Sequence, residues 1–195
     1  MNLPNAISLG RLFLAPVFYV AFHIPGWTGL NPLVFYVLLW FFYWIAEISD
    51  IVDGKIARKH GLVSSLGKVL DPLSDVVTHT TYFFCFVEAG ILPGWAFMIF
   101  LLRELGIILV RMILLSEGTA LGAGLGGKIK SVFFGISSAF GLLVLGALIF
   151  GITSQITSYL KLAFWIVFGV GMFLSILSFF QYLDSFLRRP RHVTR

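Results

Sequence analysis

Residues 50–75 read DIVDGKIARKHGLVSSLGKVLDPLSD, and this stretch decides how the rest of the chain is interpreted. It joins the end of one apolar segment to the start of the next, and it contains Asp50, Asp53, Asp71 and Asp75. Carboxylates placed within apolar helices are costly and usually serve a function. Residues three or four positions apart share a helix face, so each pair of aspartates points one way. We expect the two faces to converge on one acidic site.

The composition places the chain in a membrane. Of its 195 residues, 58% are hydrophobic and only 12% are charged, which is about half the charged fraction of a soluble domain. The formal net charge is +5, but the basic residues lie in short segments, which favours contact with anionic lipid over binding to nucleic acid. Cys85 is the only cysteine, so an intramolecular disulfide is excluded. We expect one all-α integral membrane domain over residues 1–195.

Six apolar segments have the length of a membrane helix, about 20 residues. Turn-forming glycines and prolines separate them, with Pro25-Gly26 expected to open the first loop. The six predicted transmembrane helices are 7–23, 32–57, 67–90, 94–116, 130–151 and 158–186. Residues 1–8 are expected to form a short interfacial element, and the basic tail 187–195 to contact anionic lipid.

The distribution of basic residues predicts the orientation. They gather near the second and fourth loops and at the C-terminal end, whereas the opposite loops are nearly free of them. By the positive-inside rule, both termini and the aspartates lie on the cytoplasmic side of the cell inner membrane.

Hard divalent cations prefer carboxylate oxygens, and magnesium usually shares its ligands with substrate phosphates. Two carboxylates from each helix are suited to two Mg²⁺ ions, with Mn²⁺ as an alternative. Gly54 and Ala57 leave room for a ligand against the backbone, and Arg58 is suited to pair with a phosphate.

The acids have two other interpretations. They could be structural partners of arginines and lysines, although such a network would not need Gly54, Ala57 and Gly67 at these positions. They could also line the pathway of a cation transporter, but an ion pathway favours acids at mid-membrane on several helices. Here they lie at one end of two adjacent helices.

At these positions the chain resembles the CDP-alcohol phosphotransferase family. The eight fixed positions of that family's motif are present as Asp50, Asp53, Gly54, Ala57, Arg58, Gly67, Asp71 and Asp75. The resemblance implies displacement of CMP from a CDP-linked substrate by an alcohol. It also implies that the aspartates ligate the metals, with Asp75 in addition acting as general base. The small residues with Asp50 and Arg58 would form the cytidine-diphosphate pocket. A homodimer is implied in the same way.

Within the family, the chain is most similar to the bacterial phosphatidylglycerophosphate synthases. The segments that carry this similarity are residues 2–8 with Arg11, residues 70–75, Arg103-Glu104 with Arg111, and residues 127–130. This similarity implies CDP-diacylglycerol as donor and glycerol 3-phosphate as acceptor. Ser74, Val76 and Ser131 depart from the usual alanine, lysine and threonine. Inositol phosphate or serine as acceptor, or a CDP-amino-alcohol passed to diacylglycerol, therefore stay open.

An anionic acceptor beside four carboxylates needs cations of its own. The candidates are Arg103, Arg111, Lys128 and Lys130. For Arg111 and the two lysines the alternative is contact with lipid head groups, whereas Arg103 could pair with Glu47, Glu104 or an aspartate.

Two further polar residues accompany the acids. His79 follows Asp75 by one turn and is interpreted as a hydrogen-bonded packing residue. Glu47 precedes Asp50 by one turn and is expected to lock helices together.

Overall fold

The computed structural model describes residues 3–59, 67–116, 125–152 and 155–187. Over these residues the predicted all-α class and the six helices are confirmed. The helices are α1 (Leu3–Thr28), α2 (Pro32–Lys59), α3 (Gly67–Glu88), α4 (Gly94–Ser116), α5 (Leu125–Ile149) and α6 (Gln155–Leu187).

The first helix is longer than predicted at both ends. Pro4 lies in its first turn, where a missing backbone N–H has no cost. Pro25 was expected to open a loop, but it lies inside the helix, whose last turn closes with the Gly29 amide donating to the Pro25 carbonyl at 2.9 Å. Gly29, with φ of 68°, is the residue that ends α1. A proline near a helix end removes a single hydrogen bond, so the helix continues past it.

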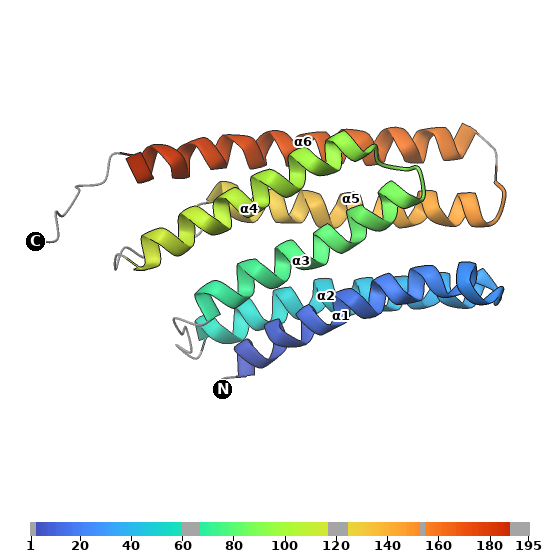
Figure 1. Ribbon diagram of the computed structural model, residues 1–195, viewed down its shortest axis with the longest axis horizontal. Helices are drawn as coiled ribbons and strands as arrows, with labels where there is room; N and C mark the ends of the chain where they lie inside the picture. The colour runs from blue at the N-terminus through green and yellow to red at the C-terminus, as the bar shows by residue number, and fades with distance from the viewer. Residues whose placement is uncertain (1–2, 60–66, 117–124, 153–154, 188–195) are drawn as a thin grey trace, which may run out of the picture.

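The six helices lie side by side in an antiparallel bundle (Figure 1). α1 packs against α2 and α3, and α5 packs along α6. α3 lies between these two groups, because it contacts α1 on one side and α4 and α5 on the other. The start of α1, the end of α2 and the start of α3 all lie at the left end of the bundle in Figure 1, as do the end of α4, the start of α5 and the end of α6. The aspartates are therefore brought to one end.

Aromatic rings form the centre of the bundle and fix the position of α3. Phe83 is fully buried and makes edge-to-face contacts with Phe100 of α4, Phe134 of α5 and Phe168 of α6. The ring centroids are 4.9, 5.8 and 5.1 Å apart, within the favourable range for aromatic pairs. One residue of α3 thus contacts three helices, just over two turns from Asp75.

Among the described residues, four helices are long and apolar enough to cross a membrane: α1, α2, α5 and α6. α3 and α4 fall short by composition, because α3 carries Asp71 and Asp75 and α4 carries Arg103, Glu104 and Arg111. Most of these charges belong to residues that the sequence predicts for the site: Asp71, Asp75, Arg103 and Arg111.

Candidate functional site

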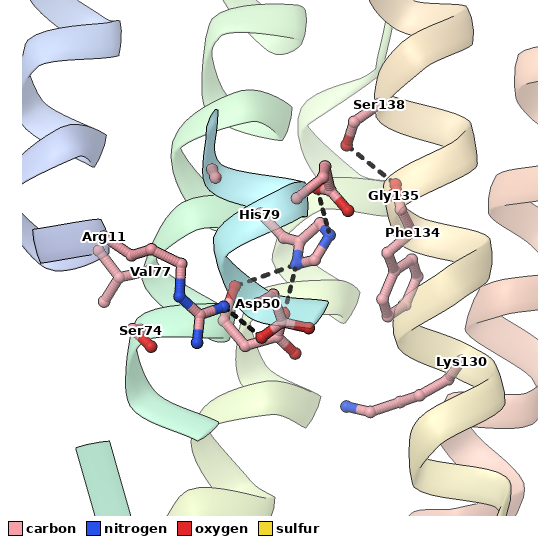
Figure 2. Close-up of polar contacts among 12 residues, drawn as sticks. Arg11, Asp50, Ser74, Val77, His79, Lys130, Phe134, Gly135 and Ser138 are labelled. Atoms are coloured by element: carbon pink, nitrogen blue, oxygen red, sulfur yellow. Dashed lines mark hydrogen bonds and ion pairs between the residues drawn. The ribbon is translucent and has the colours of Figure 1, made fainter. Parts of the chain in front are cut away.

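Three of the four predicted aspartates meet at the open end of α1, α2 and α3. Asp50, Asp53 and Asp71 each offer a carboxylate oxygen, and these atoms all lie within 4.8 Å of one another. The Arg11 guanidinium of α1 pairs with all three, and Figure 2 shows it beside Asp50. It donates to Asp50, to Asp53 at 3.1 Å and to Asp71 at 2.8 Å. Three carboxylates from two helices are thus held by one cation from a third.

Ser8, one turn before Arg11, extends this contact. Its hydroxyl is 3.0 Å from Asp53 Oδ2 and 3.2 Å from the Pro4 carbonyl. Both Ser8 and Arg11 are only 3% exposed, because the first turns of α1 pack on α2 and α3. Residues 3–8 are therefore helical and partly buried against the acids, while their predicted interfacial position stays a prediction.

The acidic cluster fits a divalent cation. Its donors are all carboxylate oxygens, the set that magnesium and manganese prefer. The guanidinium already held among them shows that this position favours positive charge. Asp53 Oδ1 is buried and has no hydrogen-bond partner, so one ligand atom remains available. The side chains of Asp50 and Asp71 are 37% and 53% exposed, so the cluster can be reached from the end of the bundle.

The fourth aspartate has a different environment. Asp75 Oδ1 lies 3.3 Å from His79 Nδ1, and the Asp75 backbone carbonyl lies 3.0 Å from the same nitrogen. On its other side, His79 Nε2 faces Glu47 Oε1 of α2 at 3.8 Å. Asp75 does not belong to the cluster of mutually close carboxylates found among the described residues. Its predicted roles as ligand and base stay predictions.

Two of the four predicted acceptor cations, Arg103 and Lys130, form a second polar group between α4, α5 and α6. Lys130 donates to both oxygens of Glu104 at 2.7 Å, and Arg103 donates to the same carboxylate at 2.5 Å. Arg103 also donates to the Ser175 carbonyl at 2.8 Å and to the Ser178 hydroxyl. All of these side chains are buried. Of the partners expected for Arg103, the structure shows Glu104. The Lys130 ammonium contacts this protein carboxylate, whereas the alternative interpretation placed it against lipid head groups.

Lys130 connects this group to the aspartates. Figure 2 shows its ammonium extending from α5 toward the side on which Asp50 and His79 lie. It is close enough to Asp75 for the two charges to interact. Arg111 contacts α6: its guanidinium donates to the Tyr182 hydroxyl at 3.1 Å, and its Cζ lies over that ring, 5.1 Å from the ring centroid. Lys130 is thus paired with Glu104 within electrostatic range of Asp75, and Arg111 lies against α6.

The residues predicted for the cytidine-diphosphate pocket are only partly described. Gly54 lies in α2 immediately after Asp53, and Gly67 is the first residue of α3. Ala57 and Arg58 continue α2 and Lys128 lies in α5, but these three side chains fall outside the described residues. Their predicted roles stay predictions.

Two contacts at the site were missed from the sequence. Arg11 was assigned only to the N-terminal resemblance, yet it binds three aspartates. Two consecutive antiparallel helices place the start of the first at the same end of the bundle as the end of the second. The position of Arg11 near the start of the first helix therefore indicated that it lies close to the aspartates. His79 is a buried, hydrogen-bonded residue as predicted, but its partner Asp75 was not named, although the i, i+4 spacing indicates their contact.

The fold and the site together define a class of protein. A helical bundle with membrane-length apolar helices and an oxygen-only acidic cluster at one end is a membrane protein with a candidate divalent-cation site. The profile of the CDP-alcohol phosphatidyltransferase family matches residues 1–177, and the chain belongs to this family. It is therefore a multi-pass membrane enzyme, a transferase of phospholipid biosynthesis, and the family implies CDP-diacylglycerol as substrate and the use of divalent metals.

Curated relatives match nearly the whole chain. A CDP-diacylglycerol–glycerol-3-phosphate 3-phosphatidyltransferase of Treponema pallidum is 30% identical over 95% of this chain and 89% of its own length. The protein of the same description from Bacillus subtilis is 31% identical over 94% of each chain. A probable phosphatidylglycerophosphate synthase of Mycobacterium tuberculosis is 29% identical over 96% of this chain and 82% of its own. The predicted resemblance to this group is confirmed.

Proposed function

We propose that the protein is a phosphatidylglycerophosphate synthase, which transfers the phosphatidyl group of CDP-diacylglycerol to glycerol 3-phosphate and releases CMP. The observation that carries the acceptor is Lys130, a buried cation that is paired with Glu104 and whose charge also interacts with that of Asp75. A phosphorylated acceptor must approach carboxylates that repel it, so a cation next to them lowers the electrostatic cost of its binding. The names of the relatives support the same acceptor.

On the donor side, Asp50, Asp53 and Asp71 would hold divalent cations, two Mg²⁺ ions in our proposal with Mn²⁺ as an alternative. When bound, these cations neutralise the pyrophosphate and stabilise the charge that develops during transfer. Gly54, Ala57, Arg58 and Gly67 are proposed to shape the pocket for the cytidine diphosphate, together with Asp50.

Asp75 is proposed as the general base and as a further metal ligand. The acceptor hydroxyl oxygen forms a bond to the phosphorus of the phosphatidyl group, while the bond from that phosphorus to the CMP oxygen breaks. The hydroxyl proton passes to the Asp75 carboxylate. The Asp75 carboxylate contacts His79, whereas the other three aspartates pair with Arg11.

Lys130, Arg103, Lys128 and Arg111 are proposed to receive the acceptor phosphate. The charge of Lys130 interacts with that of Asp75, and Arg103 is joined to Lys130 through Glu104. A phosphate that binds here would share these two cations with the Glu104 carboxylate. Arg111 and Lys128 are proposed to lie at the edge of this phosphate site.

An acceptor other than glycerol 3-phosphate is a second candidate for the proposed function, because of Val76. This residue is buried and apolar where the phosphatidylglycerophosphate synthases usually carry a lysine. The chain thus offers one cation fewer to a phosphate, which favours an acceptor without a phosphate, such as serine, on the same reaction centre. Transport of cations is no longer a candidate, because the family match makes the chain a transferase.

The placement in the membrane is part of the proposal. All six helices are proposed to cross the cell inner membrane, with the end that holds the acids facing the cytoplasm and residues 1–8 lying at the interface. The basic tail 187–195 is proposed to contact anionic lipid, and the protein to act as a homodimer.

The test is CMP release by purified protein with CDP-diacylglycerol and Mg²⁺, across glycerol 3-phosphate, inositol phosphate, serine and a no-acceptor control. We expect release only with glycerol 3-phosphate, and its loss when EDTA is added. Release with a different acceptor alone would overturn the assignment of the acceptor and leave the reaction standing. No release with any acceptor would overturn the proposed donor, and CDP-amino-alcohols with diacylglycerol would be tried next.

A further inference from the structure

His79 is the one histidine of α3 and is 4% exposed, deep among helices that also carry the acids. Its ring lies between α5 and the acids near Asp50 (Figure 2). Tyr82, Phe83 and Phe134 surround it, with ring centroids 6.1, 6.3 and 6.1 Å away. A polar ring held this tightly among aromatic rings has few orientations available, so the direction of its nitrogens is fixed.

The two nitrogens of His79 face two different acids. Nδ1 lies 3.3 Å from Asp75 Oδ1 and 3.0 Å from the Asp75 carbonyl, so the ring proton belongs on Nδ1 and is shared between these oxygens. Nε2 is buried without a hydrogen-bond partner and faces Glu47 Oε1 at 3.8 Å. His79 therefore connects Asp75 of α3 to Glu47 of α2.

The position of Glu47 is set from a third helix. A side-chain carbon added at Gly135 of α5 would lie 2.7 Å from Glu47 Oε2, so the glycine leaves space that this carboxylate occupies. Tyr43, one turn before Glu47, donates from its hydroxyl to the Gly135 carbonyl at 3.0 Å. Glu47 is thus confined between α5 and the His79 ring.

We propose that His79 is a positioning residue for Asp75, with Glu47 holding the far side of its ring. Arg11 holds the other three aspartates, and His79 holds the fourth from the opposite side. A base must lie within hydrogen-bond reach of the hydroxyl that it deprotonates, so an orienting contact raises turnover more than substrate binding. The positioning role rests on the proposed function, because turnover is what it serves.

The kinetic test compares substitutions that keep or remove each contact. His79→Leu removes both nitrogens, and we expect kcat to fall about 30-fold with KM for both substrates within about twofold of wild type. His79→Asn places an amide N–H near the position of Nδ1, and it should recover kcat to within about threefold. Full kcat in His79→Leu would overturn the proposal, and so would equal losses in the leucine and asparagine proteins.

Gly135→Ala tests the chain of contacts without changing a polar group. The added methyl would displace the end of Glu47, a flexible side chain, so the cost in stability is small. We expect kcat to fall about fivefold while the melting temperature matches that of Gly169→Ala, whose added carbon meets nothing within 4 Å. Wild-type kcat in Gly135→Ala would remove Glu47 from the proposal.

A spectroscopic arm separates failure of this proposal from failure of the proposed function. In protein labelled with ¹⁵N-histidine, His79 should carry its proton on Nδ1, and the signal should shift in Asp75→Asn. An unchanged signal would overturn the contact whatever the activity. If the wild type prefers another acceptor, the kinetic comparison is made with that acceptor and keeps its meaning.

Discussion

At the scale of single residues, Arg11 is the feature that organises the site. Its guanidinium is buried and holds three carboxylates that would otherwise repel one another. A cation bound among these acids takes over the same neutralising role. Arg11 and a divalent cation therefore compete for the same oxygens, so the metal-free protein should depend on Arg11 more than the metal-loaded protein.

Arg11→Leu tests this competition. Without metal, the melting temperature should fall by about 10 °C, because removing Arg11 leaves the buried Asp53 carboxylate and its two partly exposed neighbours with no cation among them. Excess Mg²⁺ should restore most of the loss, and the affinity for Mn²⁺ measured by electron paramagnetic resonance should rise. Arg11→Lys keeps the charge and serves as the control. A loss of stability that Mg²⁺ leaves unchanged would contradict the prediction.

Substitutions of Asp71 and Asp75 should change different properties of the enzyme: metal affinity for Asp71 and kcat for Asp75. Asp71→Ala removes a carboxylate of the cluster, so metal affinity and activity should fall together. Asp75→Asn should lower kcat by about 10³-fold while binding of CDP-diacylglycerol is largely kept. Binding is measured by calorimetry in detergent and turnover by CMP release. Normal metal affinity in Asp71→Ala would contradict the cluster, and retained turnover in Asp75→Asn would remove it as the base.

The sequence predicted the acids of the site and not what holds them. The spacing of Asp50 and Asp53 along one helix is local, so it shows their common face directly. Arg11 is 39, 42 and 60 residues from its three partners, so no local pattern shows those bonds. The pairing of Lys130 with Glu104, 26 residues apart, was missed for the same reason.

At the scale of the helices, the turn after α3 shows how boundaries are set. Gly90, with φ of 69°, donates to the Val87 carbonyl at 3.0 Å, and Ile91 donates to the Phe86 carbonyl at 2.8 Å. This pair of bonds caps the C-terminus of α3, with the left-handed Gly90 two residues past its end. The glycine and proline that mark this loop in the sequence predicted the boundary to within two residues. Pro25 gave a wrong boundary because one proline in a last turn removes only one bond.

Gly90→Ala should destabilise the protein through the backbone alone. A side-chain carbon at Gly90 would meet nothing within 4 Å, so the cost is that of a left-handed conformation, about 1–2 kcal/mol. The melting temperature should fall by about 4 °C. Gly94→Ala at the start of α4 is the matched control, because its added carbon also meets nothing and its φ is ordinary. Equal melting temperatures in the two variants would contradict this account.

At the scale of the whole molecule, α3 joins two groups of helices with different charges. The acids lie where α1, α2 and α3 meet, and the basic network lies among α4, α5 and α6. α3 contacts helices of both groups, and its Phe83 fixes it against the second. The donor and acceptor sides of the proposed reaction therefore meet along one helix.

The orientation of the bundle can be tested with single cysteines in a Cys85→Ala background. Asn31→Cys and Asp184→Cys place exposed thiols at opposite ends of the bundle. A membrane-impermeant maleimide applied to spheroplasts should label position 31, and inside-out vesicles should show label at position 184. The reverse pattern would put the acids on the outer side of the membrane and contradict the proposed orientation.

The Arg11 contact also has a consequence for biosynthesis. α1 leaves the ribosome before α2 and α3, so the arginine enters the bilayer region ahead of the aspartates that it will meet. A lone charge near lipid is costly, and each new helix that docks on α1 would bring a carboxylate to a cation already in place. Insertion of the first three helices can then proceed before any ion is captured, and the cell can load the finished enzyme afterwards.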